Sequence, residues 1–108
     1  MKEPKANLAI NKLLKEVKNG FKADSVVSQL MEIRELGREE KDPTIVKICR
    51  LASEYIKGNE GFDIGYVAEE EIGDMTDIEY LLELMLKIEK QANREEIQEI
   101  RDKVKAEL

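Results

Sequence analysis

Apolar residues recur every three or four positions through most of this chain of 108 residues, and short polar breaks separate the stretches in which they do so. Such spacing places apolar side chains on one face of an α-helix. In the first stretch, Ile10, Leu13 and Val17 share one helical face, and Asn19-Gly20 is a typical helix end. The predicted helices cover about residues 5–19, 25–37, 43–58, 76–91 and 94–106.

Two of these helices have clear signals at their N-termini. Asp42 precedes Pro43, and proline suits the first helical turn because its missing N–H group would have no partner there. Thr76 and Glu79 have the Ser/Thr-x-x-Glu spacing, in which each side chain satisfies an amide that the first turn leaves unpaired. Both helices are therefore expected to begin at these positions.

Two other boundaries rest on less direct signals. Gly37 follows the apolar stripe of the second helix and is expected to end it. Asn93 and Glu96 repeat the capping spacing, so we expect a break there and a separate last helix. One long helix through residue 106 is the alternative, because no glycine or proline enforces the break.

The helix predicted for residues 76–91 has an unusually wide apolar face. At 100° per residue, its apolar residues cover about two thirds of the circumference and leave a narrow polar strip. A helix of this kind must be covered on two sides, so it is either the central helix of the domain or a surface for a partner. Tyr80 and Leu84 lie on the flank that would meet a partner.

The composition favours an all-α fold. Leu, Ile, Val and Ala are plentiful, proline occurs twice and tryptophan is absent, which is typical of helical proteins rather than of β-sandwiches or barrels. The length fits one domain, so we expect residues 1–108 to form a single bundle of four or five amphipathic helices. HEAT-like helical hairpins are the alternative, because LLKEVKNG at 13–20 resembles LASEYIKG at 51–58, a spacing of 38 residues.

Residues 58–77 interrupt the helical pattern with four of the six glycines and seven acidic residues. A connection of about 17 residues is longer than most loops in compact domains, and such connections are often binding loops. The alternation of Phe62, Ile64 and Tyr66, followed by Val67, predicts an apolar lid that folds back on the helices, with glycines allowing the turns. The acidic residues would then face outward.

The net charge of −6 comes entirely from the middle of the chain. Residues 1–57 carry 12 basic and 9 acidic residues, residues 58–86 carry 9 acidic residues and no basic one, and residues 87–108 carry 6 of each. A local acidic surface attracts a basic partner and repels nucleic-acid phosphates and anionic membranes. The candidate interaction surface consists of Glu69, Glu70, Glu71, Asp74 and Asp77, together with Tyr80 and Leu84.

Histidine is absent from the chain, which removes the commonest general base, the usual catalytic triads and most zinc sites. The glycines match neither GxGxxG nor the GxxxxGK phosphate loop. Cys49, the only cysteine, lies among apolar residues at helical spacing and is expected to be buried and inert. We therefore predict no catalytic, cofactor-binding or metal-binding residues.

No stretch approaches the roughly 20 apolar residues that a membrane span needs, and the N-terminus has no apolar signal region, so a cytoplasmic protein is expected. Six lysines within the first 23 residues make the first helix basic. That helix contains no arginine, and no aromatic residue interleaves its lysines. We therefore expect neither nucleic acid nor membrane as a partner.

These patterns together predict a small interaction or regulatory module, not an enzyme, whose partner is a protein with a basic surface. A second copy of the chain is an alternative partner, in a homodimer or a larger structural homo-oligomer. A further alternative is an enzyme or metal-binding protein in which carboxylates at residues 69–77 gather around Mg²⁺ or Ca²⁺.

Overall fold

The computed structural model describes residues 4–108, and these residues form six α-helices and no strand. The helices are α1 (Pro4–Asn19), α2 (Ala23–Glu39), α3 (Pro43–Asn59), α4 (Tyr66–Glu69), α5 (Asp77–Leu86) and α6 (Gln91–Glu107). The all-α prediction is confirmed, and α4 is an additional short helix within the 58–77 segment. None of the helices in the described residues has both the length and the apolar character needed to cross a membrane.

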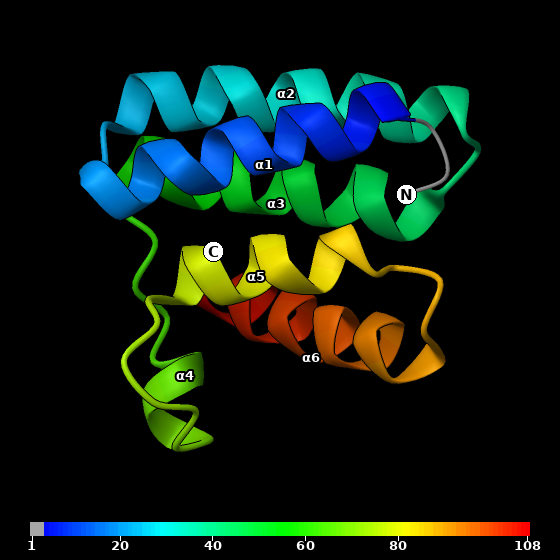
Figure 1. Cartoon of the computed structure of the whole chain (residues 1–108). Coiled ribbons are helices and arrows are strands. Elements are labelled where there is room, and N and C mark those ends of the chain that lie inside the picture. The colour runs from blue at the N-terminus through cyan, green and yellow to red at the C-terminus, as the bar shows by residue number, and fades with distance from the viewer. Residues whose placement is uncertain (1–3) are drawn as a thin grey trace.

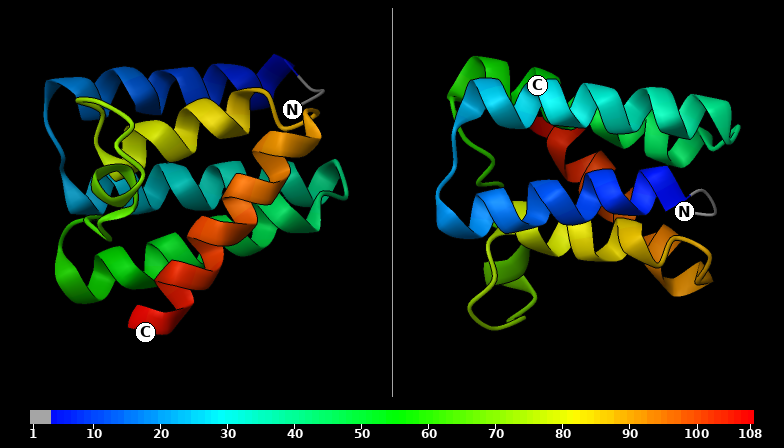
Figure 2. Two further views of the ribbon diagram at one scale, coloured as in Figure 1. Left: turned by 90° about the horizontal axis from the view of Figure 1, so that it is seen from below. Right: turned by 45° about the horizontal axis from the view of Figure 1, so that its top comes forward.

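The long helices form two packed layers (Figure 1). In one layer α2 runs antiparallel to both α1 and α3, and α5 and α6 form the other layer. α2 packs against α1 and α3, while α1 also packs on α5 and α3 on α6, which runs obliquely to the other helices (Figure 2). A solenoid of hairpins makes contacts mainly between neighbouring repeats. The contact between α1 and α5, far apart in sequence, therefore favours the bundle over the HEAT-like alternative.

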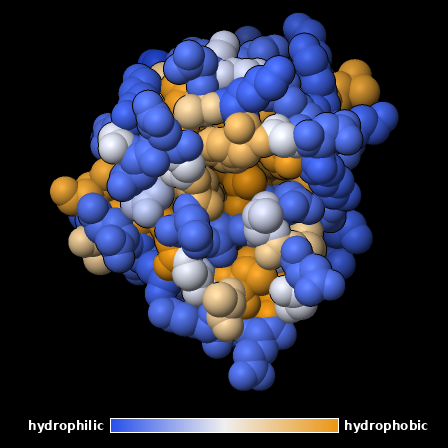
Figure 3. Space-filling model, turned by 90° about the vertical axis from the view of Figure 1, so that its left-hand side faces the viewer, coloured by the Kyte–Doolittle hydropathy of each residue, from blue (hydrophilic) through white to orange (hydrophobic). Residues whose placement is uncertain are grey.

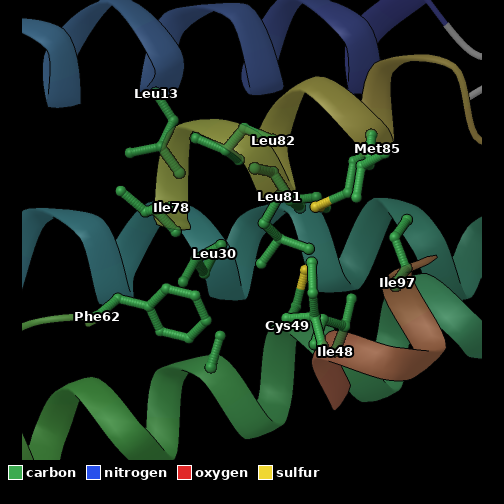
Figure 4. Close-up of a cluster of buried hydrophobic side chains, with 14 of the residues drawn as sticks. Leu13, Leu30, Ile48, Cys49, Phe62, Ile78, Leu81, Leu82, Met85 and Ile97 are labelled. Atoms are coloured by element: carbon green, nitrogen blue, oxygen red, sulfur yellow. The ribbon is translucent and has the colours of Figure 1, made fainter. Parts of the chain in front are cut away.

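The core lies between the two layers, where the predicted apolar faces meet. Figure 4 shows Leu13 of α1, Leu30 of α2 and Ile48 of α3 gathered around Leu81 and Met85 of α5. All five side chains are fully buried. Removing one such side chain from water contributes roughly 1.5–3 kcal/mol to folding. Ile97 of α6 belongs to the same cluster, so one shared core holds the five long helices together.

α5 is the central helix, which is one of the two arrangements that its wide apolar face predicted. α1, α6 and α4 all pack against it. Leu81, Leu82 and Met85 are fully buried, and Leu84 is only 6% exposed. The structure corrects the prediction that Leu84 offers a contact surface to a partner, because elements of the same chain already cover that flank.

A break separates α5 from α6, but it lies earlier than predicted. α5 ends at Leu86 and α6 begins at Gln91. The side chain of Asn93 donates hydrogen bonds to the main-chain carbonyl oxygens of Leu84, at 3.4 Å, and Lys87, at 3.1 Å. The last carbonyl groups of a helix lack the N–H partners of a continuing helix. Asn93 therefore caps the C-terminus of α5 and not, as predicted, the N-terminus of α6.

The N-terminus of α3 has the predicted Asp42-Pro43 start. The Asp42 carboxylate accepts a hydrogen bond from the Ile45 N–H group at 3.4 Å and two from the Arg94 guanidinium of α6, at 3.1 and 3.0 Å. Paired hydrogen bonds between arginine and a carboxylate are among the stronger polar contacts in proteins. Asp42 therefore caps the N-terminus of α3 and ties this helix to α6.

Gly37 lies inside α2, which continues past the predicted end to Glu39. The glycine is buried where α2 meets α3, and a Cβ atom at this position would lie 2.7 Å from Cγ2 of Ile45. No ordinary side chain fits at that distance. The absence of a side chain thus permits the close approach of the two helices.

Replacing Gly37 by alanine is expected to destabilise the protein, although alanine favours helices. The added methyl group must displace the buried, branched side chain of Ile45, and overpacking of this kind costs ~1–3 kcal/mol. Gly58 is the matched control, because it also lies in a helix but a Cβ there meets nothing within 4 Å. Gly58→Ala should stabilise by ~0.5–1 kcal/mol. Denaturant unfolding measures both changes, and equal stabilisation would show that α2 and α3 are not tightly packed at Gly37.

Candidate binding cleft

Residues 60–76 join α3 to α5 and fold back against the end of the bundle where α1 ends (Figure 1). Gly65, directly before α4, has a φ of 74°, which glycine adopts without strain. The buried apolar residues of this segment are Phe62, Ile64, Tyr66 and Val67. The predicted apolar lid is therefore confirmed.

Asp77, the first residue of α5, fixes this segment to the core. Its carboxylate accepts hydrogen bonds from the main-chain N–H groups of Ile64 at 2.8 Å, Gly65 at 3.0 Å and Val67 at 2.8 Å. Asp77 is only 8% exposed, which corrects the prediction that it belongs to an outward acidic surface. The physical reason is that the turn leading into α4 leaves these amides without helical acceptors, and one carboxylate has enough lone pairs for all three.

The other acidic residues of the predicted surface, Glu69, Glu70, Glu71 and Asp74, are exposed. Glu69 forms an ion pair with Lys103 of α6, with 2.6 Å between Oε2 and Nζ. Among residues 4–108, no three side chains of the acidic, cysteine or histidine type gather closely enough to hold a metal ion. The carboxylates of Glu69 and Asp77 therefore engage different partners, Lys103 and three main-chain amides.

Tyr80 borders this surface but is attached to α6. Its ring stacks on the ring of Tyr66 with 6.0 Å between the centroids, and its hydroxyl donates a hydrogen bond to the Glu96 carboxylate. The Tyr66 hydroxyl donates to Glu99 at 3.0 Å. Burial, the hydrogen bond to Glu96 and nearby negative charge raise the pKa of Tyr80 to about 12. Tyr80 therefore stays protonated at neutral pH and links α5 to α6.

A cleft of about 610 Å³ opens between the C-terminal end of α1 and the segment that leads into α5. Its large apolar lining residues are Val17, Phe21, Phe62, Val67, Met75 and Ile78. Its acidic lining residues are Glu60, Asp63, Asp74 and Asp77, and no lysine or arginine of the described chain lines it. Figure 3 shows this end of the molecule, where hydrophobic atoms lie in a hollow surrounded by hydrophilic residues.

Two residues of the cleft were not recognisable as site residues from the sequence. Val17 has the spacing of an ordinary core residue, and Phe21 follows the predicted helix end at Asn19-Gly20. Their position beside residues 73–78 results from the packing of α1 on α5. An apolar residue just beyond a helix end, as Phe21 is, was the one available signal.

The cleft combines an apolar floor with carboxylates at its rim. This chemistry suits a ligand that carries both an apolar group and positive charge. Comparison with protein-family models, with curated proteins and with solved structures finds no match for this chain. The function must therefore be argued from the cleft itself.

Replacing Asp77 by asparagine should loosen the segment that forms the cleft. The amide NH₂ group cannot accept hydrogen bonds from main-chain N–H groups, and a buried donor left unsatisfied costs ~1–3 kcal/mol. We expect a loss of ~2–4 kcal/mol in the free energy of unfolding, with faster amide hydrogen exchange at Ile64 and Val67. The exposed Asp74→Asn is the matched control and should change stability by less than ~0.5 kcal/mol. Equal stability of the two variants would contradict the fastening role of Asp77.

Cys49 is expected to resist thiol reagents in the folded protein. It is buried in α3, and this burial raises the pKa of its thiol to about 12. Because the thiolate is the reactive form, labelling at mildly alkaline pH should require unfolding and should accelerate on addition of denaturant. Labelling of the native protein at the rate of the unfolded chain would contradict this expectation.

Proposed function

We propose that this chain is a protein-interaction module whose cleft binds a basic protein segment that inserts an apolar side chain. The observation that carries the proposal is the composition of the cleft, which has an apolar floor, four acidic lining residues and no basic one among the described residues. Burial of the apolar side chain supplies affinity, but it does not fix the orientation of the partner, because the hydrophobic effect is non-directional. Complementary charge at the rim orients the partner and speeds its approach.

An amphipathic helix is the simplest segment with this chemistry. Residues three or four positions apart lie side by side on a helix, so lysines can flank a leucine on one face. The docking of such a helix face into an apolar groove is a recurring mode of protein recognition. Nucleic acids and anionic membranes are disfavoured, because acidic residues line the cleft and no basic residue of the described chain does.

The arrangement of reactive groups supports binding rather than catalysis. The chain has no histidine, and the thiol of Cys49 is buried with a raised pKa. The carboxylate of Asp77 is engaged by three main-chain amides. Glu69 is paired with Lys103. Histidine is thus missing from the chain, the only thiol is buried, and the carboxylates of Asp77 and Glu69 are engaged in internal contacts, which supports binding rather than catalysis.

A synthetic helical peptide with a leucine stripe flanked by lysines should bind in the cleft. Its titration into ¹⁵N-labelled protein should shift the amide resonances of Phe21, Phe62 and residues 73–76, which line the cleft. The affinity should fall as salt is added, because the rim carboxylates are accessible to screening ions. Absence of shifts, or shifts confined to other surfaces, would contradict the proposal.

Matched controls separate the roles of charge and shape. A peptide in which glutamate replaces every lysine keeps the leucine stripe but should not bind, because its negative charge is repelled by the acidic rim. The double variant Asp63→Lys/Asp74→Lys reverses two exposed rim charges and should weaken binding of the lysine peptide by about tenfold or more. Glu32→Lys/Glu39→Lys makes the same change in net charge on exposed positions of α2 and should leave the affinity nearly unchanged. Equal effects of the two double variants would mean that net charge alone governs binding.

A further inference from the structure

The outer face of α1 carries a basic strip with a leucine within it. Lys5, Leu8, Lys12 and Lys15 are three or four residues apart, so they share one face of the helix, away from its buried face. Leu8 is 70% exposed, more than any other large hydrophobic residue in the described chain. The ion pairs found within residues 4–108 involve none of these three lysines.

This strip and the cleft are complementary in two independent respects. Leu8 offers an exposed apolar side chain that can pack against Phe21 and Met75 on the floor of the cleft. The positive charge of the lysines complements the negative charge of Asp63 and Asp74. One exposed leucine is common on protein surfaces and needs no partner. The match of apolar and charged features between two surfaces of one chain is the informative observation.

We infer that the occupant of the cleft is the outer strip of α1 from a second copy of this chain. The inference rests on the proposed function of the cleft and names its partner. Leu8 inserts into the apolar floor, and the lysines on either side pair with the acidic rim. The contact thus joins two surfaces that the bundle itself leaves uncovered.

A chain cannot place its own Leu8 in its own cleft. Val17, at the edge of the cleft, follows Leu8 by nine residues, which is ~14 Å along a rigid helix. In Figure 1 the N-terminal half of α1 lies at the opposite end of the bundle from the segment that forms the cleft. The strip is therefore presented to neighbouring molecules only.

The symmetry of the contact predicts how assembly grows. The contact joins two different surfaces, the strip of one copy and the cleft of another. Two copies that exchange strip and cleft reciprocally form a two-fold dimer, whereas copies that pass the contact from one to the next form closed rings or open chains. Because one leucine and a few exposed charges carry the contact, association should depend on concentration and should weaken with added salt.

Light scattering on the full chain at low ionic strength tests the inference. The average mass should rise above the 12.4 kDa of one chain as concentration increases, and should return to that value in high salt. Leu8→Asp should abolish the rise. Leu108→Asp is the matched control, because Leu108 is also an exposed leucine, at 57%, but lies at the far end of α6, and this variant should associate like the natural sequence.

Charge exchange between the two surfaces gives a more specific test. Lys5→Glu/Lys12→Glu and Asp63→Lys/Asp74→Lys should each be monomeric alone, because strip and cleft then carry like charge. Their mixture should associate again, since each altered surface meets its complement. The substitutions change the net charge of −6 by four units in opposite directions, so both variants stay negative and non-specific attraction does not explain recovery. Lys87→Glu/Lys90→Glu, on exposed lysines outside both surfaces, should associate normally.

The outcomes separate this inference from the proposed function. A constant mass of one chain at all concentrations, retained association of Leu8→Asp, or failure of the exchanged pair to associate would each overturn the inference, provided that circular dichroism shows folded variants. Binding of the lysine peptide by a chain that stays monomeric would leave the proposed function standing. Loss of both activities would overturn both proposals.

Discussion

The carboxylate of Asp77 is the interaction on which the candidate binding end of this protein depends. The turn that enters α4 exposes the N–H groups of Ile64, Gly65 and Val67, and a helix as short as α4 does not supply their acceptors. Asp77 accepts all three hydrogen bonds from the first position of the central helix. These three hydrogen bonds thus fasten the segment, which forms one wall of the cleft, to the central helix of the bundle.

The same residue type has opposite roles in neighbouring positions of this acidic segment. Burial of a carboxylate is unfavourable unless hydrogen bonds replace its water, and the amides around Asp77 do so. Asp74, three residues earlier, is exposed at the rim of the cleft. At the other end of the bundle, Asp42 is also buried and is engaged by Arg94 and the start of α3. Buried carboxylates therefore hold helices and turns together at both ends of the bundle, whereas Asp74 lies exposed at the rim of the cleft at one end.

The distribution of charge gives the proposed contacts a direction. The acidic segment adjoins an apolar cleft at one end, whereas the lysines of α1 extend along a surface that reaches the opposite end. Apolar area supplies the attraction in such a contact, while the charges exclude partners of the wrong sign and orient the right one. In the proposed contacts the cleft accepts either a second copy of the chain or another basic segment, and salt weakens both because both depend on charge.

Local structure followed from the sequence alone, because helix periodicity and capping depend on residues a few positions apart. The starts of helices at Asp42-Pro43 and Thr76, the all-α class and the apolar lid were all predicted from such patterns. The packing of the helices was needed to show that Leu84 is covered, that Asp77 points inward and that Phe21 lines a cleft. Each of these features depends on which elements that are distant in sequence come together. In a single sequence, an aspartate that faces solvent, such as Asp74, cannot be distinguished from one that binds three main-chain amides, such as Asp77.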